Sequence, residues 1–466
     1  MSELRDLLVR TANTIADYRE GVAEGRVFPD ADTAELRAGF GGPLPVRRTP
    51  STTVVDDLVA AAEPGLVATT GPRYFGFVIG GALASATAAD LLATGWDQPA
   101  YNALSAPAAA VVEEVSGEWL KELLGIPATA SFGFVTGAQA ANTVGLAAAR
   151  HWVLRAVGYD VERDGLIGAP RVRVIASVER HATVDRSLRF LGFGTAVVEE
   201  VAADGNGAID VSRLGEVLAT TPPGPTIVVV QSGNVNTGAC DDLAAATALA
   251  HAQGAWVHVD GAFGLWASAS PATRHLVAGI DAADSWACDG HKWLNVPYDS
   301  GYVFCAHPDV HAAAMAYTAA YLALPGANAV RAPGDFVPES SRRARGLATW
   351  AALRELGRDG VAELVDRCCA LARRFADQLG AAGGVEVVND VVLNQVLVRF
   401  GKDTEADPDA TTDRVIDAVQ RSGECWMGGT TWRGMRLMRI SVSNWSTTES
   451  DVDRSVAAIL AAARAS

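Results

Sequence analysis

Residues 289–301 read DGHKWLNVPYDSG, and they place Lys292 directly between His291 and Trp293. The flanking residues are mostly apolar or small, and lysine is rarely buried without a partner because its ammonium group is costly to remove from water. Two interpretations are open. Lys292 can extend past its apolar neighbours so that its amine stays in water, or it can be a buried nucleophile that forms a Schiff base.

The pattern around this stretch indicates an α/β fold. Between residues 80 and 310, short runs rich in β-branched residues alternate with Ala/Leu-rich stretches of helical length. This order predicts βαβ units and a mainly parallel sheet, and apolar runs such as TIVVV (226–230) fit a sheet that helices cover on both faces. The runs are RVRVIAS (171–177), TAVVEEV (195–201), PTIVVVQSG (225–233), AWVHVDG (255–261) and SGYVFC (300–305).

The length of 466 residues is too great for a single core. A helical stretch and the Pro/Gly-rich connector GGPLPVRRTPSTT (41–53) precede the alternating region, and helical and strand-like stretches follow it. We therefore expect three parts: a helical segment over 1–80, a large α/β domain over 81–345, and a small α+β domain over 346–466.

The composition is that of an acidic globular protein. Apolar residues make up 49% of the chain and charged residues 20%, and the net charge is −16. This charge argues against nucleic acid or an anionic membrane as a main partner. The six cysteines form no CxxC pair, so we expect free thiols and no metal site. The N-terminus has no signal-peptide pattern and no apolar run reaches membrane-spanning length, so we expect a cytoplasmic protein.

Polar residues follow several of the predicted strands. Asp260 ends the AWVHVD run, His181 comes four residues after RVRVIAS, and the helix expected after Gly137 offers backbone N–H groups to a phosphate. Taken singly, each has a more ordinary role as a turn aspartate, a capping histidine or a plain helix start. Ligands of open α/β sheets bind beyond the carboxyl ends of the strands. Together with Lys292, these residues therefore predict a site for pyridoxal 5′-phosphate.

The sequence also resembles a known family. HVDGAFG (258–264) followed by DGHKWLNVPYDSG is similar to the group II pyridoxal-phosphate-dependent amino-acid decarboxylases, which include aromatic-amino-acid, glutamate and tyrosine decarboxylases. The resemblance extends through PRYFGFVIGG (72–81), TGAQAAN (136–142) and MRISVSNWSTTESDVDRS (438–455). It implies the aspartate-aminotransferase-like transferase fold (fold type I), with a seven-stranded, mainly parallel sheet. It also implies a homodimer with active sites at the subunit interface, where the segment over 1–80 would pack.

The resemblance implies roles for individual residues. Lys292 would form the Schiff base with the cofactor, and Asp260 would keep the pyridine nitrogen protonated. His181 would stack on one face of the ring while Ala262 packs on the other. The residues expected to bind the phosphate are Ala138 and Gln139, through their backbone, and His291.

Further assignments concern the proton donor and the substrate. Tyr321 aligns with a loop tyrosine that returns a proton to Cα after carbon dioxide leaves, unless it is only a helix-face aromatic. Asn234 and Val235 stand where the family has two threonines, so a hydroxyl contact near the Schiff base is lost or is rebuilt with Asn234 as a cofactor contact. The aromatic residues expected to line the substrate pocket, each equally compatible with a core position, are Tyr74, Phe75, Phe77, Trp96 and Tyr101.

These assignments predict a pyridoxal-phosphate enzyme that decarboxylates an L-amino acid, with an apolar or aromatic side chain favoured, to the amine and carbon dioxide. Two alternatives keep the fold and the cofactor: an aldehyde-forming oxidative deaminase, and a carbon–carbon lyase acting on a β-hydroxy amino acid. Retention of Tyr321 favours decarboxylation, whereas loss of the threonines favours the alternatives. A non-catalytic pyridoxal-phosphate-binding protein is a further alternative, and the presence together of Lys292, Asp260, His181 and Tyr321 argues against it.

Overall fold

A computed structural model describes residues 2–220, 224–317, 331–402 and 407–465. The chain divides into two compact units. We call Gly80–Ala370 with Asn389–Gln395 the sheet unit, and Met1–Ile79, Leu371–Val388 and Val396–Ser466 the terminal unit. The three-part division expected from the sequence stays a prediction. The predicted acid Tyr321 lies outside the described residues.

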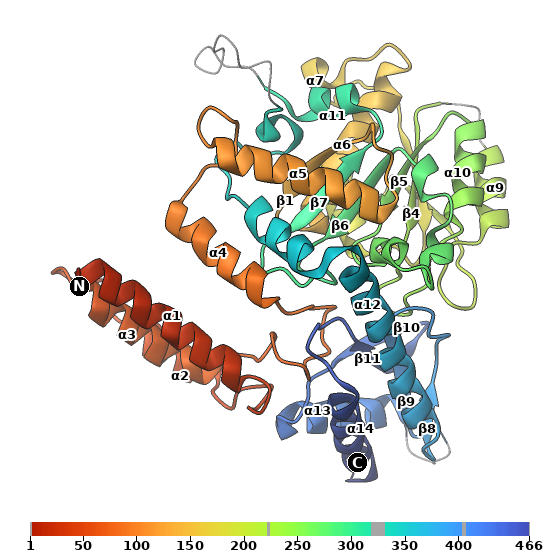
Figure 1. Ribbon diagram of the computed structural model, residues 1–466. Helices are drawn as coiled ribbons and strands as arrows, with labels where there is room; N and C mark the ends of the chain where they lie inside the picture. Colours follow the sequence, from red (N-terminus) through yellow and green to blue (C-terminus); the bar gives the residue numbers. More distant parts are fainter. Residues whose placement is uncertain (1, 221–223, 318–330, 403–406, 466) are drawn as a thin grey trace. The chain divides into compact units, whose positions relative to one another are not determined.

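The sheet unit contains a seven-stranded sheet with the order β1-β7-β6-β5-β4-β2-β3 (Figure 1). The neighbours from β6 to β3 are parallel, and β7 is antiparallel to both β6 and β1. The predicted mainly parallel sheet of fold type I is confirmed. The strands are β1 (Ser131–Val135), β2 (Arg173–Ser177), β3 (Val198–Val201), β4 (Thr226–Gln231), β5 (Trp256–Asp260), β6 (Ser285–Asp289) and β7 (Gly301–Cys305).

Helices cover both faces of this sheet (Figure 1), in keeping with the complete burial of every strand except β3. Helix α6 packs across β5, β6 and β7, and α10 packs on β4 and β5. Asp210 and Asp242 cap α9 and α10, because each carboxylate accepts hydrogen bonds from first-turn N–H groups. The helices of this unit are α4 (Ala84–Trp96), α5 (Pro107–Leu124), α6 (Ala138–Arg155), α7 (Val161–Asp164), α8 (Ala182–Phe190), α9 (Val211–Ala219), α10 (Leu243–Ala252), α11 (Pro308–Met315) and the first part of α12 (Gly346–Gly380).

The core of the sheet unit also contains a histidine. His258, on β5, is fully buried beside Trp256, and its Nδ1 and Nε2 lie 2.8 Å from Oγ of Ser285 and 2.9 Å from Oδ1 of Asn142. Burial lowers the pKa of His258 to about 3, so the ring is neutral at physiological pH. This histidine therefore serves packing between β5, β6 and α6.

The terminal unit contains both ends of the chain. Arg73 is buried and joins them, because its guanidinium donates to the carboxylate of Glu424 at 2.9 Å and to the carbonyl oxygen of Ala23 at 2.8 Å. Its four-stranded sheet has the order β10-β11-β9-β8 and gives the C-terminal part the predicted α+β character. The elements are α1 (Glu3–Gly21), α2 (Thr33–Phe40), α3 (Ser51–Ala62), β8 (Val385–Val387), β9 (Gln395–Phe400), α13 (Pro408–Ser422), β10 (Gly428–Trp432), β11 (Met435–Ser441) and α14 (Glu449–Ala465).

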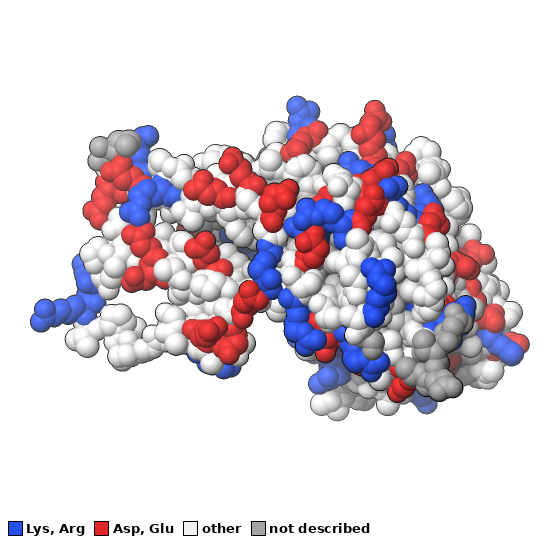
Figure 2. Space-filling model, turned by 90° about the horizontal axis from the view of Figure 1, so that it is seen from below, with Lys and Arg blue, Asp and Glu red and all other residues white. Residues whose placement is uncertain are grey.

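Charged side chains of both signs cover the surface. On the face shown in Figure 2, the acidic and basic residues that the structure describes are interspersed. Many charged residues form ion pairs, as Arg213 does with Glu216 at 2.8 Å. In the described part of the chain, every helix is too short or too polar to cross a membrane. All six cysteines are free thiols, as predicted.

Candidate functional site

The candidate site forms where β5 and β6 end and helix α6 begins. Asp260 is the last residue of β5 and Asp289 the last of β6, and the two strands are parallel neighbours. Strand β7 separates β6 from β1, and its Gly301 pairs with Asp289 on one side and Val135 on the other. The chain leaves β1 at Val135 and enters α6 at Ala138, so the start of α6 lies beside Asp289.

Lys292 lies in the loop after β6 with 19% of its side chain exposed. Its Nζ lies 2.9 Å from Oδ2 of Asp289, so the amine is neither buried alone nor extended into water. A Cβ at Gly80 would fall 1.7 Å from the carbonyl oxygen of Lys292, so the backbone of this loop packs against a position that requires glycine. The chain has two other lysines, Lys121, whose amine donates to two backbone carbonyls, and the exposed Lys402.

The carboxylate of Asp289 contacts three groups. Its Oδ1 accepts a hydrogen bond from the N–H of Ala138 at 2.5 Å and lies 3.3 Å from Nε2 of His291, and its Oδ2 pairs with Lys292. The N–H of Ser300 donates to Nδ1 of His291 at 3.1 Å, which leaves the ring proton on Nε2, facing Asp289. Burial lowers the pKa of His291, although the nearby Asp289 opposes this effect. The predicted phosphate contacts Ala138 and His291 therefore meet at Asp289.

Asp260 is buried and incompletely hydrogen-bonded. Its Oδ1 accepts a hydrogen bond from the N–H of Ala262 at 3.4 Å, whereas its buried Oδ2 has no hydrogen-bond partner among the described residues. A buried carboxylate oxygen without a donor is unfavourable and is rare in native structures. The protonated nitrogen of a pyridine ring is the donor that this oxygen lacks. Asp260, together with the amine of Lys292, therefore fits the predicted pyridoxal phosphate.

His181 and Gln139 are both engaged with helix α8. His181 precedes the helix, and its Nδ1 accepts a hydrogen bond from the N–H of Thr183 at 3.3 Å. The amide of Gln139 donates to Oγ of Ser187 at 2.9 Å, which ties α6 to α8. The capping role considered for His181 is thus present, while ring stacking by His181 and a phosphate contact through the Gln139 backbone stay predictions.

Asn234 is fully buried in the turn after β4. Its Oδ1 accepts hydrogen bonds from the N–H groups of Asn236 at 2.9 Å and Thr237 at 3.3 Å, and its amide donates to the carbonyl oxygen of Glu179 at 3.4 Å. The amide therefore stabilises its own turn. Its contact with the cofactor stays a prediction.

Two of the predicted pocket aromatics belong to the sheet unit. Trp96 ends helix α4 and is 55% exposed. Tyr101 is part-buried, with its ring centroid 6.4 Å from that of Tyr317. Both rings are accessible enough to contact a ligand.

The other three belong to the terminal unit. Tyr74 stacks on Trp426 at a centroid distance of 5.0 Å, and burial raises its pKa to about 12. Phe75 is fully buried and packs edge-on against Phe375 at 4.9 Å, which is the core alternative considered for it. Phe77 is 61% exposed and lies 5.3 Å from Trp426. A substrate contact stays a prediction for all three.

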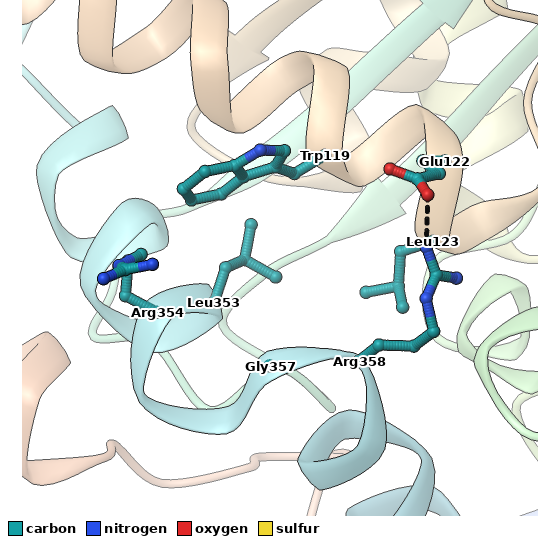
Figure 3. A pocket seen from close by; sticks show the side chains of 7 residues that line it. All are labelled: Trp119, Glu122, Leu123, Leu353, Arg354, Gly357 and Arg358. Atoms are coloured by element: carbon teal, nitrogen blue, oxygen red, sulfur yellow. Dashed lines mark hydrogen bonds and ion pairs between the residues drawn. The ribbon is translucent and has the colours of Figure 1, made fainter.

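A separate hollow of about 250 Å³ lies between α5 and α12 (Figure 3). The ring of Trp119 lies over Leu353, and the ion pair between Arg358 and Glu122 closes one end. Gly357, with a φ of 61°, interrupts α12 at this point. The hollow contains none of the predicted site residues. Its lining consists of Trp119, Glu122, Leu123, Leu353, Arg354, Gly357 and Arg358.

Asp289 is a site residue that the sequence motifs do not identify. The available signal is an acidic residue three positions before Lys292, at the end of an apolar run. A carboxylate at the end of a buried strand needs partners, because aspartate is almost never fully buried unpaired. The sequence contains that signal but does not reveal the partner Ala138, which is distant in the chain.

Comparison with known proteins identifies the family. The model of the pyridoxal-dependent decarboxylase conserved domain matches residues 36–401. Tryptophan decarboxylase 1 of Oryza sativa subsp. japonica is 26% identical over 468 residues, covering 95% of this chain and 90% of that protein. Aromatic-L-amino-acid decarboxylase of Bacillus atrophaeus is 26% identical over 456 residues, with 96% and 93% covered. Phenylacetaldehyde synthase of Arabidopsis thaliana is 24% identical over 465 residues, with 97% and 94% covered.

Solved structures show the same fold. The crystal structure of Oryza sativa TDC with PLP and tryptamine has a TM-score of 0.92 at 24% identity, covering 99% of this chain and 98% of that one. The crystal structure of mouse CSAD has a TM-score of 0.91 at 22% identity, with the same coverage. The chain belongs to the family of pyridoxal-dependent decarboxylases and is a pyridoxal-phosphate-dependent carboxy-lyase.

Proposed function

We propose that the protein decarboxylates an L-amino acid with an aromatic or apolar side chain to the amine and carbon dioxide, and that Lys292 binds the cofactor covalently. The observation that carries this proposal is the unpartnered Oδ2 of Asp260, buried at the end of β5 and beside β6, the strand that precedes the Lys292 loop. Bound pyridoxal phosphate supplies an electron sink for the electron pair released when the bond between Cα and the carboxylate breaks.

The proposed roles follow from the surroundings of each residue. Asp260 holds a proton on the ring nitrogen, because a buried carboxylate favours the charged form of a group that donates to it. The amine of Lys292, which would form the covalent bond, lies 2.9 Å from Oδ2 of Asp289. His291, neutral and with its proton on Nε2, can donate a hydrogen bond to a phosphate oxygen. For the other three residues the resemblance to the family supports the roles: His181 and Ala262 would cover the two faces of the ring, and Tyr321 would return the proton to Cα.

The preference for an aromatic substrate has two supports. Several relatives are named as aromatic-amino-acid decarboxylases, among them the proteins of Oryza sativa subsp. japonica and Bacillus atrophaeus and a tyrosine decarboxylase of Papaver somniferum. Within the sheet unit, the exposed ring of Trp96 and the part-exposed ring of Tyr101 can contact such a side chain.

The second candidate function is aldehyde formation with oxygen as the oxidant. The observation that favours it is the similarity to two phenylacetaldehyde synthases, each 24% identical over most of the chain. The turn after β4 is also compatible with aldehyde formation. Asn234 stands there in place of one of the family's threonines, and its amide makes hydrogen bonds to that turn and to Glu179. The two functions share every step up to the loss of carbon dioxide and differ in whether a proton or oxygen then reaches Cα.

Product analysis distinguishes these outcomes. Protein loaded with pyridoxal phosphate is incubated with L-tryptophan, L-tyrosine, L-phenylalanine, L-glutamate and a β-hydroxy amino acid, and carbon dioxide, amine, aldehyde and hydrogen peroxide are measured together. Carbon dioxide and amine in equal amounts from an aromatic substrate support the leading proposal. Aldehyde and peroxide in place of amine support the second candidate. Turnover of L-glutamate alone, or cleavage of the β-hydroxy substrate without carbon dioxide, contradicts the leading proposal.

We also propose that the protein is a homodimer in which α1, α2 and α3 provide part of the interface. These three helices contain no buried residue, although each carries apolar side chains. Leu8 on α1 is 59% exposed and Leu58 on α3 is 55% exposed. Large exposed apolar side chains on adjacent helices are typical of a surface that another chain covers.

A further inference from the structure

The N-terminal end of helix α6 holds an anion that belongs to the protein itself. The helix begins at Ala138, and the preceding Gly137 has no side chain to cap it. The first N–H groups of a helix lack partners within the helix and attract negative charge. Here the N–H of Ala138 donates to Oδ1 of Asp289 at 2.5 Å. Asp289 therefore occupies the kind of position in which helices bind phosphate groups.

The carboxylate of Asp289 lies close against the backbone at this helix end. A Cβ added to Gly137 would lie 3.1 Å from Oδ1 of Asp289 and 3.0 Å from the ring of His291. A Cβ added to Gly301 would lie 2.4 Å from Cα of Gly137. A side chain at Gly301 would clash with the backbone of Gly137, and one at Gly137 would press on Asp289 and His291, so the carboxylate lies directly against the backbone next to the Ala138 N–H. A phosphate group at this helix end must displace it or lie beside it.

Binding of the cofactor would also change the charges around Asp289. Lys292, 2.9 Å away, is the one cation that pairs with it among the described residues, since burial lowers the pKa of His291 and keeps that ring neutral. If Lys292 were bonded to the cofactor, its nitrogen would no longer be available only for the ion pair with Asp289. A phosphate monoester brings up to about two negative charges to the same helix end, and like charges at such distances repel.

We propose that Asp289 is an internal competitor of the cofactor's phosphate group. In the cofactor-free protein it occupies the N-terminal end of α6 and pairs with Lys292, and it thereby weakens the binding of pyridoxal phosphate but not of pyridoxal, which has no phosphate. Asp289 thus sets the cofactor concentration at which the enzyme becomes loaded. This inference rests on the proposed function, because it takes the phosphate to bind at α6 and the covalent bond to form at Lys292.

The test compares two ligands on two proteins. Cofactor-free wild type and Asp289→Asn are titrated with pyridoxal phosphate and with pyridoxal, and binding is followed by the absorbance of the bound ligand. Asparagine keeps the size of the side chain and removes its charge. The variant is expected to bind pyridoxal phosphate about tenfold more tightly, and pyridoxal within about twofold of wild type. Asp289→Ser, a smaller neutral variant, is expected to shift the ratio of the two affinities in the same direction.

Three outcomes would overturn the inference. An equal gain for both ligands would mean that Asp289 acts only through the amine of Lys292. Unchanged or weaker binding of pyridoxal phosphate would mean that the carboxylate does not compete. An equal phosphate-specific gain in Asp299→Asn would mean that any nearby negative charge has this effect, since Asp299 pairs with Arg345 at 2.6 Å and has no hydrogen bond to Ala138.

A separate measurement does not depend on the covalent bond. Inorganic phosphate should raise the thermal midpoint of cofactor-free Asp289→Asn more than that of wild type, and an equal shift would contradict the inference. Borohydride reduction of loaded wild type, with mass mapping of the labelled peptide, tests the proposed function on its own. A label away from Lys292 would refute that function, whereas a label on Lys292 with an unchanged affinity ratio in Asp289→Asn would refute only the role of Asp289.

Discussion

Nε2 of His258 lies 2.9 Å from Oδ1 of Asn142, and this contact ties strand β5 to helix α6. The same ring contacts Ser285 on β6 through Nδ1 at 2.8 Å. His258 stands two residues before Asp260. One neutral imidazole therefore links the end of β5, which carries Asp260, to helix α6, whose first residue contacts Asp289.

The acid sensitivity of folding should depend in part on His258. Its folded-state pKa of about 3 lies below the value of about 6.5 expected in the unfolded chain. As the pH falls below about 6.5, the unfolded chain takes up the proton first, so stability is lost. Between pH 7 and pH 5, protonation of this histidine in the unfolded chain should lower the free energy of unfolding by roughly 2 kcal/mol. His258→Asn should be about 2 kcal/mol less stable than wild type at pH 7 and nearly equal to it at pH 5.

Urea denaturation of the cofactor-free proteins at both pH values checks this expectation. His275→Asn is the control, because His275 is exposed and its replacement should change stability little at either pH. A difference between wild type and His258→Asn that stays constant from pH 7 to pH 5 would contradict the assignment of a neutral buried ring.

Asp260→Asn should separate activity from stability. Because Oδ2 of Asp260 has no donor among the described residues, the change should alter the free energy of unfolding of the cofactor-free protein by less than about 1 kcal/mol. Decarboxylation should fall by about 100-fold or more, because the ring nitrogen loses the charge that stabilises its proton.

The matched control for this substitution is Asp241→Asn. Asp241 is also buried, but its carboxylate accepts hydrogen bonds from the N–H groups of Ile209 at 2.7 Å and Gln231 at 2.6 Å. The same chemical change there should destabilise the protein by about 1–3 kcal/mol. Equal destabilisation by the two substitutions, measured by denaturant titration, would show that Asp260 is an ordinary structural aspartate.

Leu8→Glu and Leu58→Glu should weaken the proposed homodimer. Each places a charge on an exposed apolar position of α1 or α3, which is unfavourable within an interface. Light scattering after size-exclusion chromatography should give a dimer mass for wild type and a shift toward monomer for both variants. Leu44→Glu, at a position that is also exposed but lies in the connector between α2 and α3, should stay dimeric. A monomeric wild type would refute the proposal.

Glu113→Gln should be the most destabilising of these single changes. Glu113 and Arg342 are fully buried in the sheet unit, with Oε2 and Nη1 2.7 Å apart, and removing one charge leaves the other unpaired. We expect a loss of about 3–5 kcal/mol. The exposed pair of Arg358 and Glu122 is the comparison, and Arg358→Gln should cost less than about 1 kcal/mol in the same urea titration. Similar losses for the two variants would contradict the burial of the Glu113 pair.

The parts of the site that follow from local sequence could be predicted. The apolar run before Asp260 forms β5 as expected, and the residue ends the strand because a buried run followed by Gly-Ala breaks there. The helix start at Ala138 follows in the same way from the glycine before an alanine-rich stretch. Each of these inferences uses fewer than about ten neighbouring residues, and strand and helix periodicity can be recognised over such a length.

The relationships that the sequence does not reveal depend on strand order. Asp289 meets Ala138 because β7 inserts between β6 and β1, an arrangement of segments 151 residues apart in the chain. The joining of the two chain ends in the terminal unit depends in the same way on the contact of Arg73 with Glu424, 351 residues away. The hydrogen bonds that the Asn234 amide makes within its own turn are local. Their geometry also depends on the contact with Glu179, and so on the packing of a second loop.

The central claim is that Lys292 carries the cofactor. The chain contains three lysines, so borohydride reduction of the loaded protein and mass mapping must distinguish Lys292 from Lys121 and Lys402. We predict a label on Lys292 alone, and loss of the label, of the visible absorbance and of carbon dioxide release in Lys292→Ala. A label on another amine, or full carbon dioxide release by Lys292→Ala, would contradict the claim.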